Sequence, residues 1–525
     1  MIQENILGFE LSKKGTDTIS GFNPTKLENL PGEFAVATKA EVDEAMQKGF
    51  AAWRLYRNFS GQQKATFLRT IADEIEALGE KLVQRAMAET GLPEGRMVGE
   101  RGRTCGQLRL FAQLVEEGSW LEATIDKAQP DRTPAPKPDV RKLLVAIGPV
   151  VVFTASNFPL AFSTAGGDTA SALAAGCPVI VKAHESHPGT NALVAEAIQR
   201  AAKATNMPDG VFSSLNGSGH WLGETLVQHP LAKAVAFTGS HSGGKALYDL
   251  ANKREEPIPV FAEMGSVNPI FLLPQKVKNS YDDLAVQIAN SVNLGAGQFC
   301  TNPGLLIALD NEDTTKLAGA LRGVFSNLPQ ATMLNPGIHK NFASGKSEML
   351  SSEGVATEYE ASEEADNGKL KAPPTVASVG AKAFLENPNL QAEVFGPFSL
   401  LVKCADQGEM ERVAEALQGQ LTATVVGETA EIGAAPALLE LLREKAGRLL
   451  FNGVPTGVEV CHAMQHGGPY PATTDSRFTS VGTSAIKRFA RPIAFQNMPH
   501  DLLPPALQDE NPLGIWRTID GKLII

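Results

Sequence analysis

Cys300 is a residue whose type and surroundings are suited to chemistry. It lies in GAGQFCTNPG, residues 295–304, where glycines and polar residues surround one thiol. Most free cysteines are small buried hydrophobes, which is the structural alternative. A thiol is ionised to only a few per cent at neutral pH, yet it is intrinsically very nucleophilic. A nucleophilic Cys300 therefore needs a base or a positive environment, and no histidine lies close to it in the sequence.

The cysteines do not have the spacing of a metal or dithiol site. No two of them are separated by two residues, so zinc and dithiol sites lose support and we predict no metal site. An odd, scattered set in a large chain is typical of reduced thiols in a cytoplasm. The five cysteines are Cys105, Cys177, Cys300, Cys404 and Cys461.

Two further residues are suited to carbonyl chemistry. Asn157, in FTASNFP, is either a turn former or an amide that donates to an oxyanion. Glu263, in FAEMGSVNP, is either part of a capped turn or a general base whose pKa is raised by burial. Each motif is weak when it is taken alone.

Two other motifs are suited to binding a cofactor. In AFTGSHSGG an apolar strand ends at Gly239 and Ser240, and a helix follows, so backbone amides at the positive end of the helix dipole can approach a ligand. In VIVKAHES, Lys182 and Glu185 close a strand, where they could hold ribose hydroxyls. The alternatives are an ordinary turn, an exposed lysine and a capping glutamate.

Strand and helix patterns alternate around these motifs. Residues 41–92 predict amphipathic helices, and ERGRTCGQLRLFAQLVEEG predicts another. KAQPDRTPAPKPDVR, with its four prolines, predicts an extended crossing. From residue 143 onward, apolar β-branched runs alternate with helical segments, which is typical of an α/β fold with parallel sheets. We predict two α/β domains, one containing about 143–262 and the other about 263–477.

Composition excludes several classes of partner. The 525-residue chain has a formal net charge of −11 and no block of lysine and arginine, so nucleic acid is disfavoured. The N-terminus lacks the long apolar core of a signal peptide, and no apolar run is long enough to predict a membrane span. We therefore predict a cytoplasmic protein without nucleic-acid or membrane partners.

Taken together and in this order, the motifs are specific. Over nearly its full length the chain resembles the aldehyde dehydrogenase superfamily, in which an oxyanion asparagine, two cofactor motifs, a glutamate base, a cysteine nucleophile and a Glu-x-Phe-Gly-Pro loop follow one another. The matching residues are Asn157, Lys182-Ala-His-Glu185, Phe237-Thr238-Gly239-Ser240, Glu263-Met264-Gly265, Gly297-Gln298-Phe299-Cys300 and Glu393-Val394-Phe395-Gly396-Pro397.

The resemblance implies a fold and a division of the chain. The fold is α/β, with a Rossmann-type NAD(P)-binding domain, an α/β catalytic domain and a small oligomerisation arm that forms homodimers or homotetramers. The implied boundaries are 1–123 and 146–262 for the NAD(P)-binding domain, 263–477 for the catalytic domain, and 124–145 with 488–525 for the arm and C-terminal tail.

The resemblance also implies roles for individual residues. Cys300 attacks an aldehyde, Asn157 stabilises the oxyanion, and Glu263 activates water to hydrolyse a thioester. The residues implied in cofactor binding are Thr154, Ser156, Lys182, Glu185, Gly239, Ser240, Glu393 and Phe395.

The branch and its substrate are indicated by GRTCGQLRLFA and FNGVPTGVEVCHAMQHGGPYPATTDSRFTSVG, which are similar to the α-ketoglutarate semialdehyde (2,5-dioxopentanoate) dehydrogenases. That substrate is anionic, and Arg103, Arg109 and Arg477 are candidates for binding its carboxylate. Relatives favour NADP, yet a carboxylate at Glu185 repels a 2′-phosphate, which His184 and His187 offset only partly. The preference between NAD and NADP stays open.

Three alternatives remain. A CoA-acylating dehydrogenase would not need the water-activating base Glu263. A fatty aldehyde dehydrogenase would have an apolar, uncharged tunnel. A catalytically inert structural member of the family would not need Cys300, Asn157 and Glu263 together.

Overall fold

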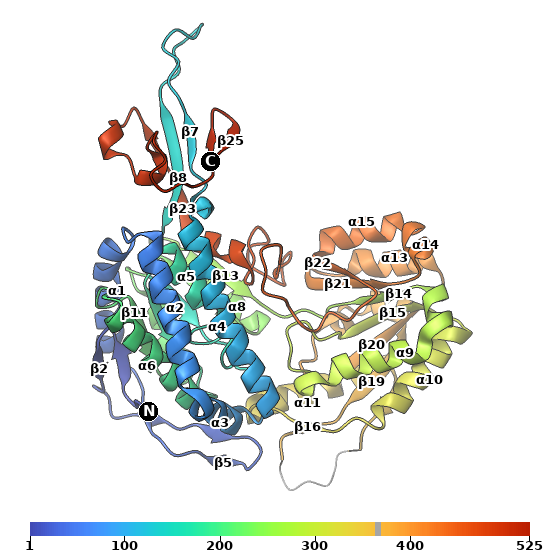
Figure 1. Cartoon of the computed structure of the whole chain (residues 1–525). Coiled ribbons are helices and arrows are strands. Elements are labelled where there is room, and N and C mark those ends of the chain that lie inside the picture. Colours follow the sequence, from blue (N-terminus) through green and yellow to red (C-terminus); the bar gives the residue numbers. More distant parts are fainter. Residues whose placement is uncertain (363–368) are drawn as a thin grey trace.

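The molecule is organised around three β-sheets, two of which lie in α/β units and the third in a projecting arm (Figure 1). A computed structural model describes residues 1–362 and 369–525. The predicted α/β class with parallel sheets is confirmed. Short pairs join β3 (Thr18–Ile19) to β6 (Phe34–Ala35), β4 (Phe22–Asn23) to β5 (Glu28–Asn29), and β16 (Ala331–Thr332) to β18 (Lys371–Ala372).

The first sheet has five parallel strands, and an N-terminal hairpin adds two further strands at one side through antiparallel pairing. Its order is β13 (Val260–Glu263), β12 (Ala234–Thr238), β9 (Val150–Phe153), β10 (Val179–Lys182), β11 (Phe212–Leu215), β1 (Asn5–Leu7) and β2 (Glu10–Ser12). Because β12 and β10 flank β9, the chain order reverses between β9 and β12, and such a reversal is where open α/β sheets bind ligands.

Helices cover both faces of the first sheet because its strands are apolar on both sides. In β9, Val150 and Val152 pack into one core, whereas Val151 and Phe153 pack into another. One face carries α2 (Gly61–Ala77), α3 (Gly79–Thr90), α4 (Glu94–Glu117), α5 (Gly167–Ala175) and α6 (Pro188–Ala204). The other carries α1 (Lys39–Tyr56), α7 (Trp221–Gln228) and α8 (His241–Asn252).

The second sheet repeats this arrangement. Its order is β17 (Ala356–Glu360), β19 (Thr375–Gly380), β20 (Phe398–Cys404), β15 (Leu305–Leu309), β14 (Ile270–Leu272), β21 (Gln420–Val426) and β22 (Ala446–Phe451). One face packs on α9 (Pro274–Asn293) and α10 (Glu312–Phe325). The other packs on α11 (Pro336–Leu350), α12 (Ala381–Glu386), α13 (Gln407–Ala416) and α15 (Pro436–Lys445), with α14 (Thr429–Gly433) before α15.

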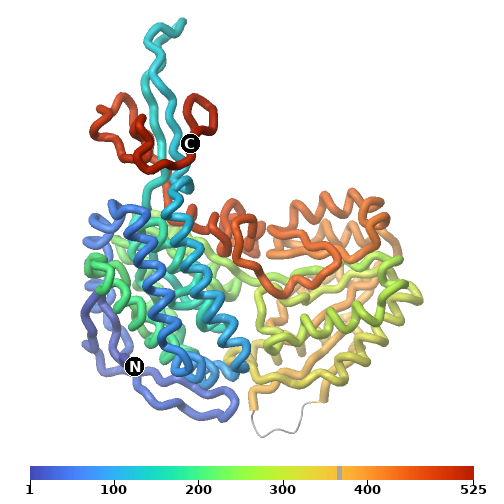
Figure 2. Tube along the Cα trace, viewed as in Figure 1, coloured from blue at the N-terminus to red at the C-terminus, as the bar shows by residue number. Residues whose placement is uncertain are grey.

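The third sheet forms the arm, which projects from the first unit (Figure 2). Its order is β23 (Ala490–Gln496), β8 (Val140–Ala146), β7 (Thr124–Asp126), β24 (Arg517–Ile519) and β25 (Lys522–Ile524). The proline-rich stretch predicted to be extended contains no helix and connects β7 to β8. A small core of its own, which includes Ile125, Leu143 and Leu507, holds the arm together.

After β22 the chain returns from the second unit to the first. A backbone bridge joins Thr473 to Glu263, and Met264 donates to the carbonyl of Ala472. The 3-10 helix η4 (Thr483–Phe489) then packs on α5, where Arg488 forms a buried ion pair with Asp168, 2.7 Å from Nη1 to Oδ1. This return crossing places residues 466–480 beside the end of β13.

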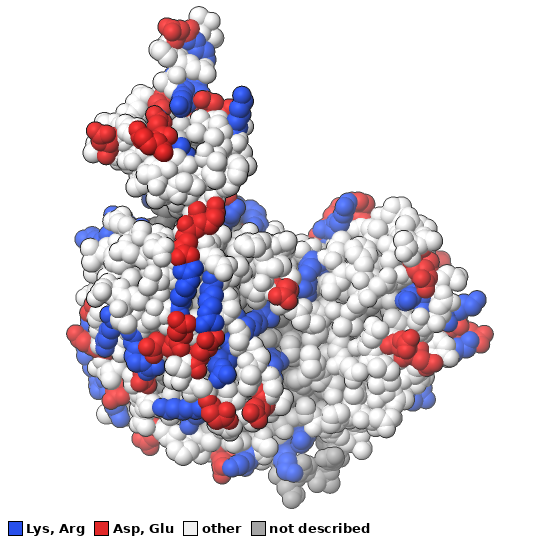
Figure 3. All heavy atoms as spheres, viewed as in Figure 1, with Lys and Arg blue, Asp and Glu red and all other residues white. Residues whose placement is uncertain are grey.

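Charges of both signs lie close together on the surface of the first unit. Figure 3 shows basic and acidic side chains intermixed over α2 and α4, where Arg109 pairs with Asp73 and Glu76. Within residues 1–362 and 369–525, no helix combines the length and the apolar character needed to cross a membrane.

Candidate active site

A strained turn presents Cys300. After α9 the chain passes through Gly295, Ala296 and Gly297, which all have positive φ angles. Gly297 is needed for a second reason, because a β-carbon there would lie 2.2 Å from the carbonyl carbon of Gly396. The turn brings the half-buried Cys300 opposite His466 and Glu263.

Asn268 fixes the backbone around Cys300. Its Nδ2 donates to the carbonyl oxygens of Cys300 at 2.9 Å, Asn302 at 3.0 Å and Ser266 at 3.1 Å. Its Oδ1 accepts from the hydroxyls of Ser266 and Thr422. Asn268 is fully buried and has a φ of 45°. One amide therefore ties the strand that follows the glutamate motif to the loop that carries the nucleophile.

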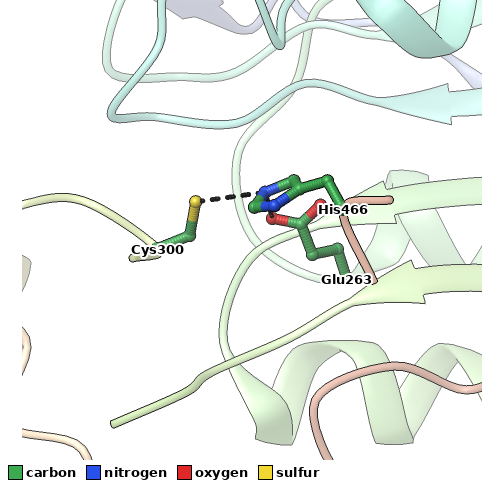
Figure 4. Close-up of side chains that lie close together, drawn as sticks. All are labelled: Glu263, Cys300 and His466. Atoms are coloured by element: carbon green, nitrogen blue, oxygen red, sulfur yellow. Dashed lines mark hydrogen bonds and ion pairs between the residues drawn. The ribbon is translucent and has the colours of Figure 1, made fainter. Parts of the chain in front are cut away.

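Cys300, His466 and Glu263 point toward one another (Figure 4). The Sγ of Cys300 lies 3.5 Å from Nε2 of His466, and that nitrogen lies 3.0 Å from Oε1 of Glu263. Glu263 ends β13, and its Oε2 accepts a hydrogen bond from the hydroxyl of Ser480. His466 and Ser480 both come from the return crossing, so this crossing completes the site.

The charges of this cluster favour a neutral thiol beside an ionised carboxylate. Burial and then the negative charge of Glu263 raise the pKa of the Cys300 thiol well above its ordinary value. Burial also acts to raise the pKa of Glu263, as the sequence analysis expected. The charge of His466 and the hydrogen bonds from His466, Ser480 and Cys300 outweigh burial, however, and leave that pKa below its ordinary value. The expectation of a raised pKa for Glu263 was therefore wrong.

His466 was missed by the sequence analysis. It lies 166 residues from Cys300, and only neighbouring histidines were considered as partners. The available signal was CHAMQHGGPYPATT, which was quoted for its similarity to one branch without a role for any histidine. Parallel sheets bring together loops that are far apart in sequence, so sequence proximity is a poor guide to partners here.

Asn157 lies on the other side of the Cys300 loop. It follows β9, and its Nδ2 donates to the carbonyl of Gln298 at 3.1 Å. Its backbone carbonyl accepts from Arg96, whose guanidinium lies 4.4 and 4.5 Å from the ring centroids of Phe158 and Phe299. The two rings also meet edge to face, and they adjoin Asn157 and Cys300 in sequence, so this aromatic contact holds the two loops together.

Of the three candidate arginines, Arg103 lies nearest the site. It is half-buried on α4 with its guanidinium 5.6 Å from the ring of Phe162, and it interacts electrostatically with Cys300. Burial lowers its pKa. Its Nε and Nη2 are buried, and neither has a hydrogen-bond partner among residues 1–362 and 369–525. These two N–H groups are free to bind an anion.

The other two arginines are engaged elsewhere. Arg109 lies six residues further along α4, which turns it to another side of the helix, and it forms exposed ion pairs with Asp73 and Glu76. Arg477 is 80% exposed and pairs with Asp475. The structure does not bring either residue to Cys300, so their assignment to the substrate site is corrected.

Arg448 is a second cation that the sequence analysis missed. It lies on β22, donates to the carbonyls of Pro455 and Gly457, and keeps a buried Nε without a partner in the described chain. Burial lowers its pKa, and the charge of a Cys300 thiolate acts in the opposite direction. Arg448 therefore adds to the positive potential around the thiol.

The residues implied in cofactor binding gather at the carboxyl ends of the first sheet. Thr154 follows β9 and donates to the carbonyl of Lys182, which ends β10. Gly239 follows β12, and Ser240 caps α8 by accepting from the amide of Gly243. These loops flank the β9–β12 reversal, where a ligand is expected.

The donor set at this edge fits a dinucleotide. Lys182 supplies an ammonium group whose pKa burial lowers, and Glu185 supplies an exposed carboxylate that accepts from the amide of Gly219 at 3.3 Å. Such groups suit ribose hydroxyls and phosphate oxygens. From the second unit, Glu393 reaches so close to Gly265 that a β-carbon there would lie 2.3 Å from Oε2.

The two histidines near Glu185 have structural roles. Nε2 of His187 lies 2.9 Å from the carbonyl of Ala155, and Nδ1 of His184 accepts from the amide of Ser186. Burial lowers the pKa of both rings, that of His184 well below its ordinary value. They are therefore neutral at physiological pH, and the expectation that their charge partly offsets Glu185 was wrong.

Comparisons with known proteins agree with this geometry. The model of the aldehyde dehydrogenase family matches residues 11–479. The chain is 51% identical over 520 residues to α-ketoglutaric semialdehyde dehydrogenase 2 of Azospirillum brasilense, covering 99% of each chain. It is 46% identical over 507 residues to α-ketoglutaric semialdehyde dehydrogenase of Acinetobacter baylyi, covering 96% of each.

A solved structure of similar fold is betaine aldehyde dehydrogenase of Staphylococcus aureus in complex with NAD⁺. It has a TM-score of 0.81 and 20% identity, with 95% of this chain and 97% of that chain covered. The chain belongs to the aldehyde dehydrogenase family, whose members oxidise aldehydes with NAD(P). The resemblance stated from the motifs is thereby confirmed.

Asn268→Ala tests how strongly the site depends on one amide. The substitution leaves three buried carbonyls without their donor, at about 1–3 kcal/mol for each unsatisfied group. It also places alanine at a positive φ, which costs about 1–2 kcal/mol. We expect a fall of at least about 3 kcal/mol in the free energy of unfolding in urea, together with a reduced kcat.

Asn206→Ala is the matched control, because Asn206 is exposed and has a φ of 55° without this network. Its free energy of unfolding should fall only by the cost of placing alanine at a positive φ. Equal losses in the two variants would show that the hydrogen bonds of Asn268 contribute little.

Proposed function

We propose that this enzyme oxidises α-ketoglutarate semialdehyde to 2-oxoglutarate. The observation that carries the proposal is Arg103, which interacts electrostatically with Cys300 and has two buried N–H groups without a hydrogen-bond partner among the described residues. A guanidinium binds a carboxylate with two parallel hydrogen bonds, and the dioxo acid has a carboxylate at the opposite end from its aldehyde. The two α-ketoglutaric semialdehyde dehydrogenases that match over nearly their whole length support the same substrate.

The first step is attack by Cys300. The thiol proton moves to the Glu263–His466 pair, the S–C bond forms, and the carbonyl oxygen becomes an oxyanion. His466 is the first acceptor, because its Nε2 faces both Sγ and the carboxylate. The Asn157 amide and the Cys300 backbone N–H stabilise the oxyanion, and losing one such donor typically costs on the order of 10²–10³ in rate.

The bound nicotinamide would supply a hydride acceptor, so that the adduct on Cys300 becomes a thioester. Glu263 then takes a proton from water, the water oxygen bonds to the acyl carbon, and the C–S bond breaks to regenerate Cys300. Glu263 is 3% exposed and ionised, and hydrogen bonds orient it toward the thiol. A buried, oriented base of this kind supports transfer to water rather than to CoA.

We propose that both NAD and NADP are accepted. Lys182, Glu185 and Ser240 would hold the adenosine ribose and the phosphates, with Thr154, Ser156 and Gly239 lining the same edge. Glu393 and Phe395 would contact the nicotinamide ribose and ring. Glu185 disfavours a 2′-phosphate, while the ammonium of Lys182 favours it, because a carboxylate repels and a cation attracts that group.

Initial rates of NADH and NADPH formation test the proposed function. We would compare α-ketoglutarate semialdehyde, succinic semialdehyde, hexanal and a long-chain aldehyde at matched cofactor levels. The dioxo acid should lead in kcat/KM by tenfold or more, about 1.4 kcal/mol. Cys300→Ala should abolish turnover while cofactor binding persists. A lead for the neutral aldehydes would indicate a fatty aldehyde dehydrogenase, and no turnover with any aldehyde would indicate an inert member.

Arg103→Met tests the carboxylate site. A hydrogen bond to a charged group contributes about 1.5–3 kcal/mol, so kcat/KM for the dioxo acid should fall by about 10- to 150-fold. The rate with hexanal, which has no carboxylate, should change little. Arg109→Met on the same helix is the control and should leave both rates unchanged. A parallel loss with both substrates would assign Arg103 a structural role.

We propose that the arm joins copies of the chain into a homodimer or homotetramer. β25 is an edge strand, and its Leu523 is 69% exposed, with Ile524 and Ile525 also exposed. Edge strands with apolar side chains pair readily with another chain.

Leu523→Lys should weaken this association without unfolding the chain, because the side chain is already exposed. Light scattering after gel filtration should give a smaller mass for the variant than for the parent. Leu55→Lys, at a 60% exposed leucine of α1, is the control and should keep the parent mass. A monomeric parent chain would contradict the proposal.

A further inference from the structure

Cys300, His466 and Glu263 also form a set of metal ligands. One atom from each side chain, a sulfur, a ring nitrogen and a carboxylate oxygen, lies within 4.8 Å of the other two. No two cysteines have the C-x-x-C spacing that is typical of a zinc site built from one stretch of sequence. These three ligands instead lie far apart in sequence and come from the Cys300 loop, the return crossing and the end of β13.

Hydrogen bonds leave this cluster incompletely satisfied. Oε1 of Glu263 is buried and points at the other two ligand atoms, and the donors beside it are the ring nitrogen of His466 at 3.0 Å and the Cys300 thiol, which also face each other. Nε2 of His466 faces both Sγ at 3.5 Å and Oε1 at 3.0 Å, yet one N–H can be directed at only one of them. The atoms Sγ, Nε2 and Oε1 therefore face one another, and one N–H proton cannot hydrogen-bond to both of the other two atoms.

We propose that these three residues bind Zn²⁺ and that zinc reversibly inhibits the enzyme. Thiolate, imidazole and carboxylate are the ligands that Zn²⁺ takes, at about 2.0–2.3 Å each. A tetrahedral ion with such bonds has ligands about 3.3–3.7 Å apart, so small side-chain rotations suffice. Thiolate ligation also selects Zn²⁺ over Mg²⁺ and Ca²⁺, which prefer oxygen.

The surroundings supply the remaining parts of a metal site. The hydroxyl of Ser480 donates to Oε2 of Glu263, which leaves Oε1 facing the cluster and orients the ligand as outer hydrogen bonds do in metal proteins. Cys300 is half-buried, so part of it is accessible to an ion from solvent, and water or another small ligand can take a fourth position.

Binding exchanges a proton for the ion without any redox step. Zn²⁺ bonds to Sγ, and the thiol proton is released to solvent, while Nε2 of His466 and Oε1 of Glu263 donate electron pairs. The bound thiolate can no longer attack a carbonyl, and the carboxylate can no longer accept a proton. The inhibition therefore rests on the proposed function, whereas the binding of the ion does not.

Cobalt spectroscopy tests the binding without an activity assay. Co²⁺ bound by a thiolate in a four-coordinate site gives an intense near-ultraviolet charge-transfer band and visible d–d bands. Adding Co²⁺ to the full-length protein should produce this band with one equivalent, and one equivalent of Zn²⁺ should abolish it. Mg²⁺ in excess should leave it unchanged.

Two variants test the sulfur and nitrogen ligands, and a third serves as the control. Cys300→Ser should remove the charge-transfer band, and His466→Gln should weaken Zn²⁺ binding by about tenfold or more. Cys461→Ser is the matched control, because Cys461 is a half-buried cysteine outside the cluster, and its spectrum should equal that of the parent. Circular dichroism checks that each variant is folded. A band that persists in Cys300→Ser, or no band in the parent protein, would overturn the proposal.

An inhibition assay tests whether bound zinc blocks aldehyde oxidation, separately from whether zinc binds. Zn²⁺ should inhibit aldehyde oxidation by the parent and by Cys461→Ser alike, high aldehyde should relieve the inhibition, and EDTA should restore the full rate. Full activity with zinc bound, as judged by loss of the cobalt band, would refute the inhibition. If no aldehyde is oxidised, the proposed function fails while the cobalt spectra still decide the metal site.

Discussion

The hydrogen bonds of Asn268 set the distance between nucleophile and base. The glutamate ends a strand of the first sheet and the cysteine follows a helix of the second unit, so no single element holds both. Asn268 follows the glutamate by five residues and binds the carbonyl of Cys300 directly. Rigid scaffolds place reacting groups to within fractions of an ångström only when such second contacts lock the loops. The fully buried amide does this for a turn of positive φ angles.

The cluster shows how two ionisable groups acquire different tasks through their surroundings. Burial opposes the charge of both Cys300 and Glu263, but hydrogen bonds and the neighbouring histidine outweigh burial only for the carboxylate. Environments that push two pKa values apart separate the roles of proton donor and proton acceptor. The thiol is kept protonated until it is needed, and the group that removes its proton is already charged.

The sequence was sufficient for the fold and for the first contacts of the site. Apolar β-branched runs such as β9 predicted parallel sheets, and the family resemblance carried by the motifs assigned Cys300, Glu263 and Asn157 to one site. It was insufficient for residues whose role depends on the path of the chain. His466 and Ser480 reach Glu263 only because the chain returns after β22, and no local pattern records that return.

The arginines are another case in which the sequence alone could not predict which residue reaches the site. On one helix, Arg103 and Arg109 are equally plausible by composition, but helical rotation turns one toward Phe162 and the other toward Asp73 and Glu76. The choice depends on which face of α4 packs against the core, which requires the tertiary structure. Similarly, burial of His184 and His187 cannot be read from residue types, although it decides whether they are charged.

The return crossing has a consequence for the order in which the protein is made. Synthesis proceeds from the N-terminus, and domains generally fold as they emerge. The glutamate and the cysteine leave the ribosome more than a hundred residues before His466 and Ser480 do. A nascent chain that has folded its two sheets therefore carries a thiol without its histidine partner. The reactive centre matures only after the return crossing that follows β22 has been translated.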